Sequence, residues 1–222
     1  MILNSNKKDI PARFSLRSWL MAKVYDSFMR KAEKKYFSKW RSGLLKNLSG
    51  SVLEIGAGTG VNNIHYPSII SKLTLTEPDP NMLKILRKRA KQRNDITVEI
   101  QRATVEKLPF PDNSFDFVVC TFLLCSVFAP QDSLSEIFRV LKSGGKYVFL
   151  EHVANTENNR AYKWQKRIEP IWKFVGGNCH MTRDTAYEID TSGFKILDLH
   201  TEYIAGGTSI INPFIRGVAQ KP

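Results

Sequence analysis

Three glycines at alternate positions, directly after a short apolar strand, constrain the fold of this chain more than any other feature. The stretch VLEIGAGTG occupies residues 52–60 and places Gly56, Gly58 and Gly60 behind residues that favour a strand. Glycine inside a strand or helix is destabilising by about 0.5–1 kcal/mol relative to alanine. Three together therefore indicate either a turn with positive φ or a ligand that approaches the backbone closely.

Predicted strands and helices alternate along the chain after residue 50. Strands separated by helices require crossover connections, which predict a doubly wound α/β fold with a mostly parallel, seven-stranded sheet. We expect Pro80 to open one helix and Ser143-Gly144-Gly145 to end another. The strands are expected at 51–55, 72–77, 96–101, 115–121, 145–152, 194–204 and 214–220, and the helices at 61–70, 80–93, 131–142 and 154–175.

Residues 1–49 are expected to form a basic amphipathic helical arm, followed by one domain over residues 50–222. The chain carries a net charge of +12, and nine of these charges precede Gly50. Residues 16–45 interleave apolar and basic side chains at helical spacing. This segment either covers a face of the sheet, the interpretation we favour, or lies on anionic lipid. An anionic membrane surface is therefore a candidate partner of residues 7–46.

The cysteines indicate a reducing compartment, and the hydropathy gives no sign of a membrane span. Cys120, Cys125 and Cys179 lack the CxxC or Cys/His spacing of a zinc site, so we expect reduced thiols and no metal. No apolar run approaches the roughly 18 residues of a membrane span. We expect a soluble, cytoplasmic protein, peripheral to a membrane at most. The acid-poor first 25 residues leave a transit peptide as an alternative.

The glycine-rich turn is expected at a ligand site, because ligands of doubly wound folds bind at the carboxyl edge of the sheet. A dinucleotide fingerprint reads GxGxxG, but the position of its third glycine is Val61 here. Glu77 ends the second expected strand, where one carboxylate can accept hydrogen bonds from both ribose hydroxyls. The pattern predicts a nucleoside ligand without a pyrophosphate.

The spacing ExGxGxG at 54–60, Glu77, and the phrase VEKLPFPDNSFDFVVC at 105–120 resemble the small-molecule branch of the class I S-adenosylmethionine-dependent methyltransferases. The resemblance covers roughly residues 50–220 and implies a Rossmann-like fold that binds S-adenosyl-L-methionine. It places Glu77 at the ribose, and Thr104 stands where many relatives have aspartate. The cofactor-binding residues that it implies are Glu54, Gly56, Ala57, Gly58, Gly60, Asn62, Glu77, Pro78, Met82, Thr104, Val105, Glu106, Thr121 and Leu123.

Five further phrases are similar to the thiol S-methyltransferases of the methyltransferase-like group and their bacterial relatives. They read GVNNIHYP, VCTFLLCSV, LEHV, EPIWKFVGGNCHMTRDT and PFIRGVAQK. This resemblance implies a small, apolar methyl acceptor, with a thiol favoured. Several vertebrate members carry an N-terminal membrane anchor, for which this chain offers the amphipathic arm as a peripheral contact.

Methyl transfer from a sulfonium is an in-line displacement, in which the protein mainly supplies position and desolvation. A thiol with a pKa of about 8.5 is mostly protonated at neutral pH, so a nearby base or cation would favour the reactive thiolate. The candidates are His152, His180 and Arg183. Each also has a structural explanation, such as a hydrogen bond from His152 to a backbone carbonyl or an ion pair of Arg183 with a neighbouring acid.

Other functions stay open. Methylation of nucleic acid would suit the positive charge, but Cys120-Thr121-Phe122-Leu123 replaces the Asn/Asp-Pro-Pro-aromatic turn of amino-methylating enzymes. Methylation of RNA at a 2′-oxygen or ring carbon stays a less favoured alternative, and we expect no nucleic-acid partner. Tyr25-Asp26 begins, but does not continue, the Tyr-Asp-x-Met-Asn phrase of quinone methyltransferases. Methylation of a phospholipid amine suits the basic arm. A non-catalytic partner subunit would keep the glycine loop without turnover.

Overall fold

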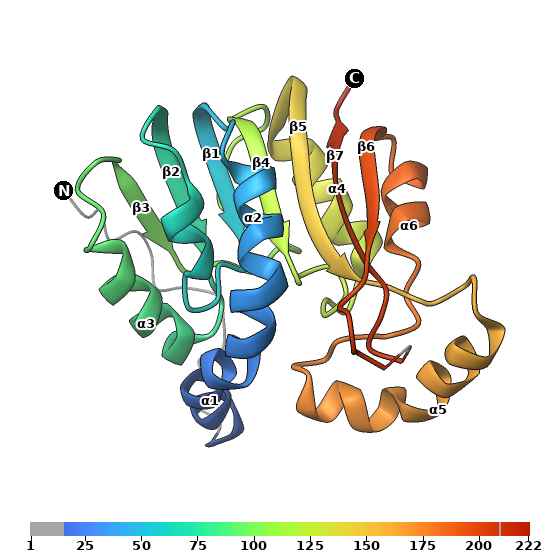
Figure 1. Ribbon diagram of the computed structural model, residues 1–222. Helices are drawn as coiled ribbons and strands as arrows, with labels where there is room; N and C mark the ends of the chain where they lie inside the picture. Colours follow the sequence, from blue (N-terminus) through green and yellow to red (C-terminus); the bar gives the residue numbers. More distant parts are fainter. Residues whose placement is uncertain (1–15, 209) are drawn as a thin grey trace.

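Seven strands form one sheet in the order β3-β2-β1-β4-β5-β7-β6 in the computed structural model of the chain, which describes residues 16–208 and 210–222 (Figure 1). The doubly wound α/β fold expected from the sequence is thereby confirmed. The strands are β1 (Gly50–Ile55), β2 (Ile70–Thr76), β3 (Val98–Gln101), β4 (Phe115–Thr121), β5 (Leu141–His152), β6 (Lys195–Glu202) and β7 (Phe214–Gln220). The helices are α1 (Leu16–Ala32), η1 (Glu33–Phe37), α2 (Ser38–Leu45), η2 (Val61–His65), α3 (Pro80–Ala90), α4 (Pro130–Val140), α5 (Asn159–Val175) and α6 (Thr185–Thr191).

Strands β1 to β5 run parallel, while β7 lies between β5 and β6 and runs antiparallel to both. The carboxyl ends of the five parallel strands therefore meet at one edge, at the bottom of Figure 1. Glu54 on β1 pairs with Leu75 of β2 and Val119 of β4. The segments that follow these three strands are thus neighbours in space, although they are far apart in the sequence.

Both faces of the sheet are buried, as the continuous apolar character of its central strands requires. Leu53 and Phe149 belong to a cluster on one face, where Leu134, Ile137 and Val140 form the fully buried side of α4. A second cluster covers the other face and includes side chains of η1, α2 and α3. In Figure 1, α2 lies in front of the strands and α4 lies behind them.

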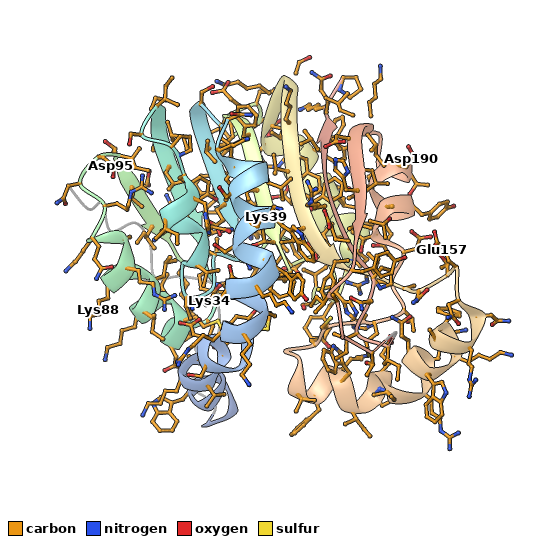
Figure 2. All side chains as sticks on the ribbon, viewed as in Figure 1. Lys34, Lys39, Lys88, Asp95, Glu157 and Asp190 are labelled. Atoms are coloured by element: carbon orange, nitrogen blue, oxygen red, sulfur yellow. The ribbon has the colours of Figure 1, made fainter. Side chains whose placement is uncertain are left out.

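The N-terminal helices pack on the sheet through their apolar side chains. Phe37 is 1% exposed and lies 4.9 Å from Phe122 and 5.3 Å from Phe214 between ring centroids. The basic side chains Lys34 and Lys39, labelled in Figure 2, are exposed on the same segment. The part of the arm before residue 16 lies outside the described residues. Within the described ranges, no helix is both long and apolar enough to be a membrane span.

The expected helices are shorter in the structure than the sequence suggested, and the one expected at 80–93 ends at Ala90. The helix expected at 61–70 is the single short η2, because Tyr66 precedes Pro67 and adopts an extended conformation. The helix expected at 131–142 ends at Val140, and the glycines predicted to cap it lie inside β5. Gly145 is needed there because a Cβ atom would lie 2.8 Å from the carbonyl oxygen of Lys142.

Helices α5 and α6 begin where side chains cap their first turns. Asn158 accepts a hydrogen bond from the backbone N–H of Ala161, so α5 starts at Asn159 rather than at residue 154. Asp184 accepts a hydrogen bond from the N–H of Tyr187 and starts the short helix α6, which the sequence analysis did not include. Both corrections lie on the connection between β5 and β6.

We predict that Phe37→Ala lowers the free energy of unfolding by about 3–5 kcal/mol, because it removes a buried ring that packs against Phe122 and Phe214. Urea denaturation measures this loss. Ile69→Ala, at a position that is 74% exposed, is the control and is expected to change stability by less than about 0.5 kcal/mol. Equal, small effects of both substitutions would contradict a structural role of η1.

Candidate functional site

The three glycines after β1 all adopt positive φ, at +67° for Gly56, +57° for Gly58 and +85° for Gly60. A Cβ atom on Gly56 would lie 2.7 Å from Leu123, and one on Gly60 would lie 2.7 Å from Leu86. The nearest such atom to a Cβ on Gly58 is 4.0 Å away. Gly56 and Gly60 are thus required by the turn and its packing, whereas the backbone at Gly58 stays open to a ligand.

Glu77 follows β2 and is held beside the glycine loop. One carboxylate oxygen accepts a hydrogen bond from the N–H of Gly58, and the other accepts one from the N–H of Asp79, each at 2.8 Å. The residue is 5% exposed, and burial raises the pKa of its carboxyl group to about 7. Each oxygen keeps a further lone pair with which it can accept a hydrogen bond from a ligand hydroxyl.

Glu54, near the end of β1, is fully enclosed. Its carboxylate accepts hydrogen bonds from the side chains of Asn62 and Tyr66, both at 2.8 Å. Burial raises the pKa of Glu54 to about 7, against the opposing effects of these two donors and of Arg41. Asn62 is equally buried. Its hydrogen bond to Glu54 therefore holds the first residues after the glycine loop against β1.

Arg41, a residue that the sequence analysis did not single out, reaches the same edge from α2. Its guanidinium donates hydrogen bonds to Asn62 Oδ1 at 2.7 Å and Thr121 Oγ1 at 2.8 Å, and it forms an ion pair with Glu33 at 3.1 Å. The residue is only 2% exposed. The sequence did contain a sign of its burial, because Arg41 shares a side of the helix with Trp40, Leu44 and Leu45. Arg41 therefore connects the N-terminal helices to the ends of β1 and β4.

Asp26 on α1 makes a second connection to the glycine loop. Its carboxylate accepts a hydrogen bond from Thr59 Oγ1 at 2.8 Å and forms an ion pair with Arg89 of α3. Arg89 in turn donates to the backbone oxygen of Thr59 at 3.1 Å. The glycine loop is thus held between α1 and α3.

The other expected cofactor residues lie at the same edge of the sheet. Pro78 and Met82 flank the start of α3, where Asp79 accepts a hydrogen bond from the N–H of Met82 at 3.0 Å. Thr104 follows β3 and forms an isolated bridge with Lys107. Ala57 and Val105 are buried, whereas Glu106 is exposed.

The segment after β4 has an unusual backbone that a buried carboxylate supports. Phe122 adopts a φ of +57°, which is uncommon for a residue with a side chain. Glu151 of β5 accepts hydrogen bonds from the N–H groups of Leu123, Leu124 and Cys125 at 3.0–3.1 Å. Burial raises the pKa of Glu151 well above its ordinary value. Sequence reasoning missed Glu151. An acidic residue inside an apolar strand could have indicated a buried carboxylate with a specific partner.

His152 is buried at the end of β5, with Nδ1 3.3 Å from the sulfur of Cys179. Burial lowers the pKa of His152 to about 4, so its imidazole is neutral at neutral pH. A hydrogen bond with Cys125 lowers the pKa of the Cys179 thiol. His152 also makes a hydrogen bond to the backbone of Ile211, so the structural explanation offered for it holds, and the Cys179 thiol is a second neighbour.

The loop at 176–185 is bound to the segment after β4. Arg183 donates hydrogen bonds to the backbone oxygens of Leu124 and Val127, and the N–H of His180 donates to the oxygen of Cys125 at 2.7 Å. The half-buried imidazole of His180 lies 3.6 Å from Glu169, and its pKa is lowered by burial and by Arg183. The three expected catalytic candidates thus lie near the segment that follows β4. Arg183 joins this segment to the 176–185 loop by hydrogen bonds.

Comparisons with known proteins agree with this arrangement. A family model described as a methyltransferase domain matches residues 53–149. The rat thiol S-methyltransferase TMT1B is 36% identical over 210 residues, which cover 93% of this chain and 84% of that protein. The human thiol S-methyltransferase TMT1A is 31% identical over 200 residues, which cover 89% of this chain and 82% of that protein.

Solved structures share the fold at low sequence identity. The structure of geranyl diphosphate methyltransferase in complex with S-adenosylmethionine has a TM-score of 0.68 and 13% identity, and the match covers 96% of this chain and 94% of that one. The chain belongs to the class I S-adenosylmethionine-dependent methyltransferases. Within that class it is similar to the thiol S-methyltransferases. It is therefore a small-molecule methyltransferase whose cofactor is S-adenosyl-L-methionine.

The residues present fit this cofactor. The open backbone at Gly58 leaves room for a ligand, and Glu77 beside it offers acceptor positions that suit ribose hydroxyls. Within the described residues, no cluster of histidine, cysteine or acidic side chains could hold a metal ion. The donor supplies an activated methyl group when it is bound, and the protein's own side chains bind and orient the reactants.

We predict that the stability of the wild type falls relative to that of Glu54→Gln as the pH rises. The folded protein keeps the proton of Glu54 up to about pH 7, whereas the ordinary value for an unfolded chain is 4.5. Its contribution to stability therefore decreases between these two values, by up to about 3 kcal/mol. Urea midpoints at pH 5 and pH 7.5 measure the difference, and the exposed Glu157→Gln serves as the control. A pH-independent difference would contradict the assignment.

Proposed function

We propose that this protein transfers a methyl group from S-adenosylmethionine to the sulfur of a small, apolar thiol. The observation that carries the proposal is the 36% identity with a thiol S-methyltransferase over 93% of the chain. The reaction is an in-line displacement: the sulfur of the acceptor forms a bond to the methyl carbon, and the bond from that carbon to the donor sulfonium breaks. The thiol loses its proton, and S-adenosylhomocysteine and a methyl thioether leave.

The cofactor lies, in this proposal, along the carboxyl ends of β1 to β4. Glu77 accepts hydrogen bonds from the ribose hydroxyls, and the buried Arg41 supplies positive charge that suits the carboxylate of the donor. Thr121 and Leu123, at and after the end of β4, would lie beside the reacting sulfonium. The proposed lining residues are Glu54, Gly56, Ala57, Gly58, Gly60, Asn62, Glu77, Pro78, Met82, Thr104, Val105, Glu106, Thr121 and Leu123.

The three remaining candidates have different roles in the proposed reaction. His180 accepts the thiol proton, because it is half-buried and its lowered pKa leaves the imidazole neutral. Arg183 and His152 are positioning residues. Arg183 holds the 176–185 loop to the segment after β4, and its positive charge favours a thiolate nearby. His152 supports the same loop through Cys179.

A phospholipid amine or a quinone ring is the second candidate acceptor, for which the basic arm is the supporting observation.

We propose that residues 1–49 act as a cap on a catalytic domain of residues 50–222. Asp26 and Arg41 support this, since both contact the site from the arm. We further propose a cytoplasmic location and a peripheral contact between residues 7–46 and an anionic membrane. Nucleic acid is not a proposed partner.

We predict that Glu77→Gln weakens binding of S-adenosylhomocysteine by about 1.5–3 kcal/mol, because the amide cannot accept at both positions. The ribose hydroxyls of the ligand would stabilise the ionised form of Glu77. In the free protein, burial raises the pKa of Glu77 to about 7, so the carboxyl group is protonated at lower pH. Wild-type affinity is therefore expected to rise as the pH increases toward 7 and then to level off. Calorimetric titration measures both effects.

The matched control for this titration is Glu99→Gln, on the neighbouring strand β3, where the carboxylate pairs with Lys72. It is expected to leave affinity and its pH dependence unchanged. Unchanged affinity of Glu77→Gln would remove the ribose assignment.

We predict that the full chain forms S-adenosylhomocysteine with an alkyl thiol, and not with phosphatidylethanolamine vesicles, a benzoquinone or transfer RNA. His180→Ala is expected to lower kcat for the thiol about a hundredfold at neutral pH. Activity should recover above the thiol pKa of about 8.5, where the acceptor ionises without a base.

His200→Ala, at a partly exposed histidine on β6, is the control and should keep the wild-type pH profile. Turnover with the phospholipid alone would replace the thiol proposal by the second candidate. A uniform loss in His180→Ala at every pH would restrict His180 to a structural role.

A further inference from the structure

Helix α5 carries an exposed stripe of alternating basic and apolar side chains. Arg160, Trp164, Arg167, Ile171 and Val175 follow one another at intervals of three or four residues and therefore share one side of the helix. All five are exposed, with Trp164 at 45% and Ile171 at 70%. The buried Ala161 and Gln165 lie about a quarter of a turn around the helix from the stripe. The helix is therefore held to the domain by the side next to the stripe and leaves the stripe itself exposed.

Helix α5 carries a large excess of positive charge. The helix carries five lysines and arginines and a single acid, Glu169. That acid accepts hydrogen bonds from the backbone N–H and the hydroxyl of Thr182, at 2.9 and 2.7 Å, so it is used within the protein. The guanidinium of Arg167 lies 5.5 Å from the ring centroid of Trp164. The exposed surface thus combines an indole, aliphatic side chains and positive charge.

This stripe lies at the end of the molecule that holds the candidate site. Helices α1 and α5 both lie at the edge where the parallel strands end (Figure 1), and Figure 2 shows side chains of α5 directed away from the sheet. Asn178, just after α5, donates a hydrogen bond to the backbone oxygen of Ser126 at 2.6 Å. Phe128, two residues further on, is 86% exposed. The segment after β4, which carries this exposed ring, is therefore hydrogen-bonded to the residues that follow α5.

We propose that the α5 stripe is a docking surface for an anionic lipid bilayer and that it turns the mouth of the active site toward the lipid. Tryptophan and aliphatic side chains of an interfacial helix enter the boundary between headgroups and acyl chains, while arginines reach the phosphates. Anionic lipid complements the charge of α5, which an uncharged or cationic partner would not. The proposal holds for any acceptor, and it places the main contact on α5 rather than on the arm.

The test measures binding of the full chain to phosphatidylcholine vesicles with and without phosphatidylserine, at physiological salt. The wild type is expected to sediment with the anionic vesicles only. Trp164→Ser/Ile171→Ser and, separately, Arg160→Glu/Arg167→Glu are expected to reduce the partition coefficient at least about tenfold. Binding of S-adenosylhomocysteine, measured in parallel, is expected to stay unchanged and shows that the variants are folded.

Two matched variants change the same chemistry elsewhere. Ile69→Ser/Leu199→Ser removes two exposed apolar side chains, and Lys91→Glu/Lys195→Glu reverses two exposed charges, all outside α5 and the arm. Both are expected to bind vesicles within about twofold of the wild type. A charge variant on the arm, Lys34→Glu/Lys39→Glu, is expected to lower binding less than the α5 variants.

Several results would overturn the proposal. They are failure of the wild type to bind anionic vesicles, equal losses in the α5 and matched variants, and loss in the arm variant alone. A dimer in gel filtration that Trp164→Ser/Ile171→Ser dissociates would assign the surface to a second copy of the chain. Binding of single-stranded RNA in place of vesicles, with the same sensitivity to the α5 variants, would assign it to nucleic acid.

Discussion

A buried guanidinium joins the two parts of this protein. Arg41 comes from the N-terminal helices, yet its hydrogen bonds go to Asn62 behind the glycine loop and to Thr121 at the end of β4. Glu33 balances its charge from the same helices. Removing one partner of such a buried group leaves the other without compensation, which costs several kcal/mol. The site therefore depends on helices that come before the first strand.

Three buried carboxylates organise the rest of the edge, and each is held by neutral donors. Glu77 accepts from two backbone N–H groups, Glu54 from two side chains, and Glu151 from three backbone N–H groups. Burial raises the pKa of all three. Glu77 and Glu151 thereby join segments that belong to neighbouring strands, whereas Glu54 holds the segment after β1 against its own strand.

The sequence was sufficient for features whose cause is local. Gly56 and Gly60 adopt positive φ where a side chain would collide, and the alternation of apolar runs predicted the sheet. Sequence reasoning failed where the cause is distant. Arg41 and Glu151 obtain their roles from partners 21 to 80 and 26 to 28 residues away. The end of η2 also has a local cause, since Pro67 disfavours a helical conformation of Tyr66.

The position of β7 has a consequence for biosynthesis. This strand comes last in the chain, yet it lies between β5 and β6 and supplies hydrogen bonds to both. Until residues 214–220 have left the ribosome, β5 has an open edge and β6 has no neighbour in the sheet. Open strand edges are templates for pairing with other chains. A nascent chain of this protein therefore exposes an open strand edge until residues 214–220 have emerged, and a stop codon before residue 214 would leave that edge without its partner.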